Sequence, residues 1–87
     1  MQISFHRNFL KMYAKQQQSV QEKFKERRDL FISDSTHPVL RDHALNGKWR
    51  GYRSINISGD YRAVYREVAD DTFEFVAIGT HHELYGT

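Results

Sequence analysis

The sequence predicts a small α+β protein in which two N-terminal helices pack on one face of a twisted, mainly antiparallel sheet, in the order β-α-α-β-β-β. Two observations predict this fold. Apolar residues recur at helical spacing before residue 33, whereas three runs after residue 48 are rich in β-branched and aromatic residues. The chain has 87 residues, so we expect one domain with one hydrophobic core over residues 1–87.

The N-terminal third of the chain contains the predicted helices. Residues 2–5 form a possible first strand, and residues 6–16 form the first helix, with an irregular apolar stripe. Ser19 has Glu22 three residues later, the spacing of a capping box, so we expect the second helix to begin there. This helix extends to about Ser33, since apolar residues recur along one face at Val20, Phe24 and Phe31.

The remainder of the chain is predicted to form the sheet. Pro38 prevents the second helix from resuming, so residues 37–48 are expected to connect the helices to the strands. Strands are predicted over residues 49–58, 61–68 and 72–80, separated by short polar breaks. Breaks this short favour an antiparallel meander. The helices then cover one face of the sheet, and the other face is left for a ligand.

Side-chain alternation in the first of these strands indicates which residues share a face. Ile55 and Ile57 lie on one side, and strict alternation would place Arg53 with them. Because an arginine is unfavourable in a core, we expect a bulge or twist near Gly51 to turn it away. The opposite side would carry Tyr52, Ser54 and Asn56.

Composition limits the location of the protein and its partners. The chain has no cysteine, which fits a reducing compartment, and it has no apolar run that suits a signal peptide or a membrane span. We therefore expect a cytoplasmic protein with no membrane association. Residues 1–66 hold all thirteen Lys and Arg against six Asp and Glu, which favours a polyanionic or acidic partner.

The motif content excludes several classes of site. There is no nucleotide-binding glycine loop and no nucleophile elbow. His81 and His82 are adjacent and point to opposite sides of an extended chain, so they do not form a metal site. We therefore expect no metal and no cofactor.

Five histidines, a basic cluster and several aromatic side chains remain, and together they suit the cleavage of RNA. In that reaction the 2′-hydroxyl attacks the adjacent phosphorus, which requires a base, an acid and a cation near the phosphate. Histidine suits the first two tasks and arginine suits the third. Aromatic rings can stack on an unpaired base. These residue types are common, so composition alone leaves the function open.

Three segments make the interpretation more specific, namely residues 43–53 (HALNGKWRGYR), 59–65 (GDYRAVY) and 79–86 (GTHHELYG). Together they resemble the RelE/ParE superfamily of bacterial toxin–antitoxin toxins, and most closely its YafQ-type mRNA interferases. The resemblance implies a two-helix, twisted-sheet microbial RNase fold, ribosome-dependent cleavage of mRNA, and neutralisation by a cognate antitoxin protein. Since the sequence offers no metal site, we expect metal-independent cleavage of mRNA, in the ribosomal A site.

The resemblance also implies roles for particular residues. His81 matches the C-terminal catalytic histidine, and Arg62 matches a phosphate-binding arginine. The other residues that the resemblance and the basic cluster point to are catalytic candidates His43, Asp60 and Tyr85, and RNA-contacting candidates Lys48, Arg50 and Arg53.

Two positions depart from the YafQ pattern, which usually has an acid and, two residues later, a histidine after Gly-Tyr-Arg. Here Ser54 and Asn56 occupy these positions, so the site is either rearranged around His43, Asp60 and His81 or weakened. One alternative is a ParE-like toxin that poisons DNA gyrase without nuclease activity, although the histidine and aromatic near the C-terminus argue against it. Another is a catalytically decayed toxin that serves as an antitoxin-binding regulatory module.

Overall fold

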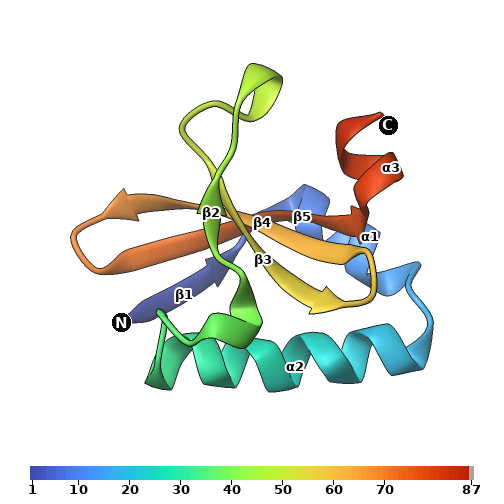
Figure 1. Ribbon diagram of the computed structural model, residues 1–87, viewed down its shortest axis with the longest axis horizontal. Helices are drawn as coiled ribbons and strands as arrows, with labels where there is room; N and C mark the ends of the chain where they lie inside the picture. Colours follow the sequence, from blue (N-terminus) through green and yellow to red (C-terminus); the bar gives the residue numbers. More distant parts are fainter. Residues whose placement is uncertain (87) are drawn as a thin grey trace.

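The computed structural model describes residues 1–86 and forms a five-stranded sheet with three α-helices (Figure 1). No helix within this range is both long and apolar enough to cross a membrane. Two 3-10 turns lie between α2 and β3: η1 (Pro38–Leu40) and η2 (Gly47–Trp49). The remaining elements are β1 (Gln2–Phe5), α1 (Arg7–Ala14), α2 (Gln18–Ser33), β2 (His43–Ala44), β3 (Arg53–Ser58), β4 (Tyr61–Ala69), β5 (Thr72–Thr80) and α3 (His81–Tyr85).

The strands lie in the order β1-β5-β4-β3-β2. Only β1 is parallel to its neighbour β5, and the other three pairings are antiparallel. The predicted α+β class, the two N-terminal helices and the antiparallel meander are therefore confirmed. Two short elements were not predicted: β2, which extends the sheet by two residues, and α3, which follows β5 directly.

The main core lies between α1, α2 and one face of the sheet (Figure 1). It is built largely from aromatic rings, because Phe9, Phe24, Phe31 and Phe75 are all at least 98% buried. Phe24 meets Phe75 edge to face, with the ring centroids 5.3 Å apart. Such geometry adds about 1 kcal/mol to the free energy gained by burial. The core therefore fixes the sheet on the helix side and leaves the other face for the site.

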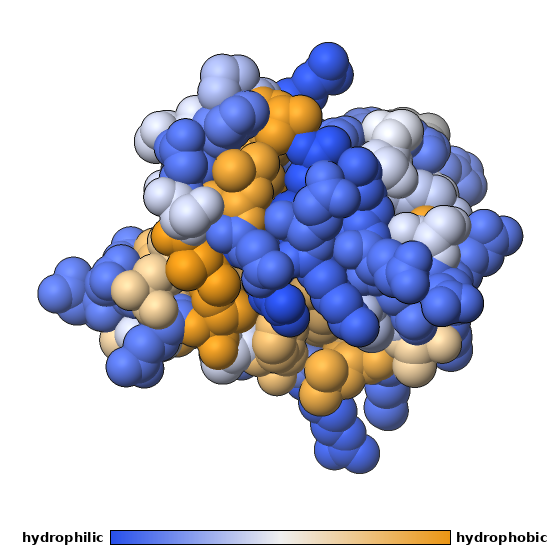
Figure 2. Space-filling model, turned by 90° about the horizontal axis from the view of Figure 1, so that it is seen from below, coloured by the Kyte–Doolittle hydropathy of each residue, from blue (hydrophilic) through white to orange (hydrophobic). Residues whose placement is uncertain are grey.

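Figure 2 views the molecule from the side of α2, where hydrophilic side chains surround a strip of apolar ones. Leu10 and Ile32 are the most exposed large apolar residues of the two N-terminal helices, at 53% and 45%. Most of the other apolar side chains of α2 face the core, as expected for an amphipathic helix.

The predicted capping box at the start of α2 is wrong. The helix begins at Gln18, and Gln17, in extended conformation, is the N-cap without a side-chain hydrogen bond. Contacts with α1 determine this start. The Tyr13 hydroxyl donates to the backbone carbonyl of Gln21 (3.1 Å), and the side-chain amide of Gln21 donates to the backbone carbonyl of Tyr13 (2.8 Å). Ser19 consequently lies within the first turn rather than before it.

The predicted bulge near Gly51 is also wrong, because β3 begins at Arg53 and alternates regularly at this end. Arg53 lies on the helix side, as strict alternation requires, but at the margin of the core, where its guanidinium reaches Asp42. The irregularity of β3 occurs at its other end, between Asn56 and Ser58. An arginine is tolerated on this side because its charge is paired and about half of its side chain is exposed.

Helix α3 begins with a capping box, which was not predicted. The Thr80 hydroxyl accepts a hydrogen bond from the Glu83 backbone N–H (3.1 Å), and the Glu83 carboxylate accepts one from the Thr80 N–H (2.8 Å). Gly86, at φ 74°, ends the helix in the left-handed conformation that favours glycine. The spacing of Thr80 and Glu83 was visible in the sequence and could have predicted this helix.

Candidate functional site

The face of the sheet opposite α2 is only partly covered. Helix α3 and the loop between β2 and β3 stand on this open face (Figure 1). A second apolar cluster of Leu45, Val64, Ala77 and Leu84 lies beneath them. Trp49 packs against this cluster, and its indole N–H donates to the Leu84 carbonyl at 2.9 Å. This contact ties the loop to α3.

A groove on this face lies between β2 with its following loop and α3. It is lined by His43, Ala44, Leu45, Asn46, His81 and Tyr85. Three of the four predicted catalytic residues therefore line one groove, although His43 is 38 positions away from His81 in the chain. His81 and Tyr85 are four residues apart on α3, which places them on one side of the helix. Their ring centroids are 4.5 Å apart, with the planes at 70°.

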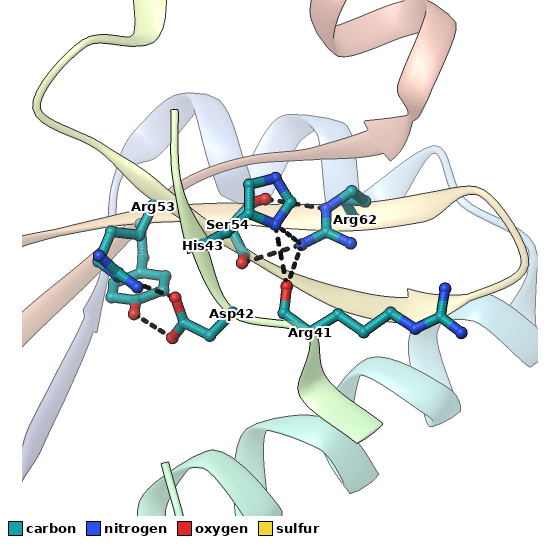
Figure 3. Close-up of polar contacts among 7 residues, drawn as sticks. Arg41, Asp42, His43, Arg53, Ser54 and Arg62 are labelled. Atoms are coloured by element: carbon teal, nitrogen blue, oxygen red, sulfur yellow. Dashed lines mark hydrogen bonds and ion pairs between the residues drawn. The ribbon is translucent and has the colours of Figure 1, made fainter. Parts of the chain in front are cut away.

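Arg62, on β4, lies buried next to this groove with 7% of its surface exposed. Figure 3 shows its guanidinium held by Ser54 and by the chain at Arg41. Its Nε donates to the Ser54 hydroxyl at 2.8 Å. Its Nη2 donates to two backbone carbonyls, those of Arg41 (2.8 Å) and Ser54 (3.0 Å). Three hydrogen bonds to two residues, Ser54 and Arg41, thus hold the planar group in one orientation.

The guanidinium keeps its positive charge in this environment. Burial lowers the pKa of Arg62, and the nearby Tyr85 phenol and Asp42 oppose that effect. Because the ordinary pKa of arginine is above 12, the group stays protonated near neutral pH. Within residues 1–86 its hydrogen bonds go to uncharged acceptors, so no carboxylate neutralises it directly. The arrangement favours an anionic ligand.

His43 lies over this cation, at the mouth of the groove. Its Nδ1 lies 3.3 Å from Nη2 of Arg62 and 3.1 Å from the carbonyl oxygen of Arg41 (Figure 3). His43 pairs with Ser54 in the sheet. The imidazole therefore lies next to the residue that binds Arg62. The imidazole is exposed, so its other nitrogen can reach a ligand.

Tyr85 completes the same cluster. Its hydroxyl is buried and makes no hydrogen bond of ordinary geometry within residues 1–86. The phenol nevertheless lies close enough to Arg62 to raise the pKa of that guanidinium. A buried hydroxyl without a partner is uncommon, and it fits a site that a ligand completes.

The structure places the other predicted residues at different distances from the groove. Asp60 lies in the β3–β4 hairpin, where its backbone carbonyl accepts a 2.9 Å hydrogen bond from the His81 N–H, so it adjoins the site. Lys48 and Arg50 lie on the loop above the open face, with the Lys48 ammonium 5.9 Å from the Trp49 ring centroid. Arg53 is not brought to the groove, because its Nε binds Asp42 at 2.8 Å on the helix side.

Several residues of this cluster were not predicted. Ser54, noted only as a departure from an acid, is the residue that orients Arg62. Arg41 contributes through its carbonyl, and nothing in the sequence signals such a backbone contact. The Asn56 amide donates to the Gly59 carbonyl at 3.1 Å and supports the hairpin instead of lining the groove. Among residues 1–86, no three His, Asp or Glu side chains lie together as a metal site requires.

Residues 1–86 match the family model of the YafQ bacterial toxin of type II toxin–antitoxin systems. Among characterised proteins, the chain is 38% identical over 48 residues to the mRNA interferase toxin YafQ of Escherichia coli K12. That alignment covers 55% of this chain and 51% of the relative, so it spans about half the length of the relative.

Solved structures agree over nearly the whole chain. The crystal structure of YafQ from Escherichia coli BL21(DE3) superposes with a TM-score of 0.80 at 27% identity, covering 97% of both chains. The chain also resembles a structure of the Escherichia coli DinJ–YafQ toxin–antitoxin complex, with a TM-score of 0.77 at 28% identity, covering 97% of this chain and 96% of that one. A YoeB/ParE toxin from Agrobacterium tumefaciens shares the fold at 19% identity, with a TM-score of 0.75 and coverage of 93% and 99%.

Proposed function

We propose that this chain, which belongs to the YafQ family of bacterial toxins of type II toxin–antitoxin systems, is an endoribonuclease that cleaves mRNA on the ribosome. One observation carries the proposal. His43 from β2, together with His81 and Tyr85 from α3, lines one groove beside a buried arginine whose hydrogen bonds within residues 1–86 go to uncharged acceptors. A relative of this chain is an mRNA interferase, which supports the same activity here.

The proposed reaction needs only groups that the chain supplies. A base takes the proton of the 2′-hydroxyl, and the 2′-oxygen forms a bond to phosphorus. The bond from phosphorus to the 5′-oxygen then breaks, and an acid gives that oxygen a proton. The products are a 2′,3′-cyclic phosphate and a 5′-hydroxyl, so no metal ion and no external cofactor take part. Arg62 stabilises the negative charge that builds on the phosphate oxygens.

In this proposal His43 and His81 share the proton transfers, since both line the groove. Tyr85 would stack on the splayed base or bind the phosphate through its unpaired hydroxyl. The Asp60 carboxylate, on the hairpin next to His81, would assist the proton transfers. Lys48 and Arg50 would attract the RNA backbone from the loop above the groove.

The cellular setting is part of the proposal. Cleavage in the ribosomal A site requires a cytoplasmic protein, and we propose that the 87 residues act as a single toxin domain. A structure of the YafQ relative contains its antitoxin DinJ, which supports an antitoxin partner for this chain. The excess of basic residues before residue 67 would favour acidic segments of that partner.

The proposal is tested by expressing the chain in bacteria without an antitoxin and mapping mRNA 5′ ends before and after induction. We expect new ends at defined codon positions within translated frames, and none with His81→Ala. His82→Ala, on the same helix but outside the groove lining, is the matched control and should still cleave. Growth arrest with intact mRNA would instead indicate a toxin that binds another target, such as gyrase.

A further inference from the structure

The chain from Arg41 to His43, here called the strap, crosses the edge of the sheet and is held from both faces. Arg41 adopts a left-handed conformation with φ 45°, which turns the chain toward β2. After this turn, the side chain of Asp42 faces the helix side, whereas His43 faces the groove (Figure 3). The position of the imidazole therefore depends on how firmly the strap is fixed.

On the helix side, Asp42 is the attachment point. One carboxylate oxygen accepts a 2.8 Å hydrogen bond from Nε of Arg53, and the other accepts one from the hydroxyl of Tyr65. The Asp42 side chain is 15% exposed and Tyr65 is 4% exposed, so solvent weakens these contacts little. Arg53 and Tyr65 pair with each other across β3 and β4, which makes the attachment part of the rigid sheet.

On the groove side, the surroundings of Nδ1 indicate which ring nitrogen of His43 carries the proton in the neutral imidazole. Nη2 of Arg62 lies 3.3 Å from Nδ1 of His43, but its two protons go to the nearer carbonyls of Arg41 and Ser54, at 2.8 and 3.0 Å. Neither proton is therefore left for Nδ1 to accept. Nδ1 of His43 lies 3.1 Å from the Arg41 carbonyl, a distance that suits donation by an N–H group. An unprotonated Nδ1 would instead face the lone pairs of that oxygen. The neutral imidazole that fits carries its proton on Nδ1 and leaves Nε2 as a free lone pair.

We propose that Asp42, held by Arg53 and Tyr65, is a positioning residue that fixes the strap so that His43 presents an unprotonated Nε2 to the groove. This inference rests on the proposed function, and it makes His43 the base and His81 the acid of the cleavage reaction. It also accounts for Arg53, whose charge is directed to Asp42 on the face of the sheet opposite the groove. Asp42 itself does not line the groove.

The first test is a double-mutant cycle measured by RNA cleavage. In Asp42→Asn one carboxylate oxygen becomes an N–H₂ group, which cannot accept from Arg53 or Tyr65. We expect kcat to fall by about 10–100-fold with KM unchanged, because misplacement of a reacting group acts on the chemical step. In a His43→Ala background, the same substitution should have no further effect on kcat. Equal losses in both backgrounds would overturn the proposal.

Tyr65→Phe is the second variant, since it removes one donor and leaves the ring packing in place. It should lower kcat in the same direction as Asp42→Asn. Asp29→Asn is the matched control, because Asp29 pairs with Arg28 at 3.1 Å on α2, away from the groove. It should leave kcat unchanged. A Tyr65→Phe protein with normal kcat and normal imidazole signals would overturn the proposal.

The second test reads the imidazole directly and needs no activity. At about pH 8, above the ordinary pKa of histidine, ¹⁵N NMR should show the His43 proton on Nδ1 in the wild type. In Asp42→Asn the signals should shift toward a mixture of both neutral forms. A proton on Nε2 in the wild type would overturn the proposal. If RNA cleavage is absent altogether, the proposed function fails while this spectrum still tests the strap.

Discussion

The hydroxyl of Ser54 accepts a 2.8 Å hydrogen bond from Nε of Arg62, and both side chains are buried. At this position the YafQ pattern usually has an acid, which here would neutralise the guanidinium. The serine hydroxyl accepts from the arginine without carrying a charge, so the positive charge is left for an anionic ligand. We therefore propose that Ser54 belongs to a site rearranged around a buried cation rather than to a weakened one.

Ser54→Asp should lower RNA cleavage. A carboxylate in this position would form a charge-assisted pair with Arg62, so less of its positive charge would act on the phosphate. We expect the single-turnover cleavage rate to fall by about 10-fold or more. Ser54→Ala, which removes the hydrogen bond and preserves the charge, should have the smaller effect. The reverse order of the two variants would show that the charge of Arg62 is not what the site uses.

Arg62→Lys should retain the charge and lose most of the activity. A lysine ammonium cannot make the planar set of bonds to Ser54 and Arg41, so the cation would move away from its position. We expect cleavage to fall by about 100–1000-fold, the usual loss when one group that stabilises the transition state is removed. The unsatisfied carbonyls should also reduce the free energy of unfolding by about 2 kcal/mol. Cleavage and urea unfolding measured on the same protein separate the two effects, and near-normal cleavage would contradict the role of Arg62.

Thr80→Ala should destabilise α3 and, through it, the positions of His81 and Tyr85. The substitution removes the hydroxyl that accepts from the Glu83 N–H. Loss of an N-cap costs about 1 kcal/mol, which corresponds to a decrease of about 5 °C in the melting temperature. Thr80→Ser keeps the hydroxyl and should keep both stability and activity. If Thr80→Ala melts as the wild type does, the capping box does not hold the helix in solution.

Alkaline pH should weaken the fold through Tyr65. Burial raises the pKa of Tyr65 above its ordinary value near 10, and the hydrogen bond to Asp42 adds to this shift. Above about pH 10 the unfolded chain loses this proton while the native protein keeps it, so stability that is complete at lower pH is lost as pH rises. The free energy of unfolding should fall less steeply above about pH 10 in Tyr65→Phe than in the wild type. Identical slopes in urea titrations of the two proteins would exclude this contribution.

Much of the fold could be predicted because its determinants are local. The runs that form β4 and β5 show the composition and the polar breaks of strands, and the observed bounds differ little from those predicted. The start of α2 could not be predicted, because it depends on contacts between Tyr13 and Gln21 from different helices. The place of Arg53 was predicted wrongly because strand alternation shows which face a residue occupies. It does not show that a partner such as Asp42 lies on that face.

The site was predictable in its residue types but not in its connections. His43, His81 and Tyr85 were identified from motifs, and the structure brings them to one groove. The support of Arg62 comes from the carbonyls of Arg41 and Ser54, and any residue can supply a carbonyl. The strap likewise crosses the edge of the sheet at a place that no sequence pattern indicates. Such contacts become visible only when the strands are placed in register.

The most direct test of the central claim is cleavage of an mRNA that carries a single 2′-deoxynucleotide at the scissile position, bound to purified ribosomes. If the groove catalyses attack by the 2′-hydroxyl, the wild-type protein will cleave the unmodified mRNA to a 2′,3′-cyclic phosphate end, and both the deoxy substitution and His81→Ala will abolish the product. Cleavage of the deoxy-substituted mRNA at the same position would contradict the account, because that substrate lacks the attacking group.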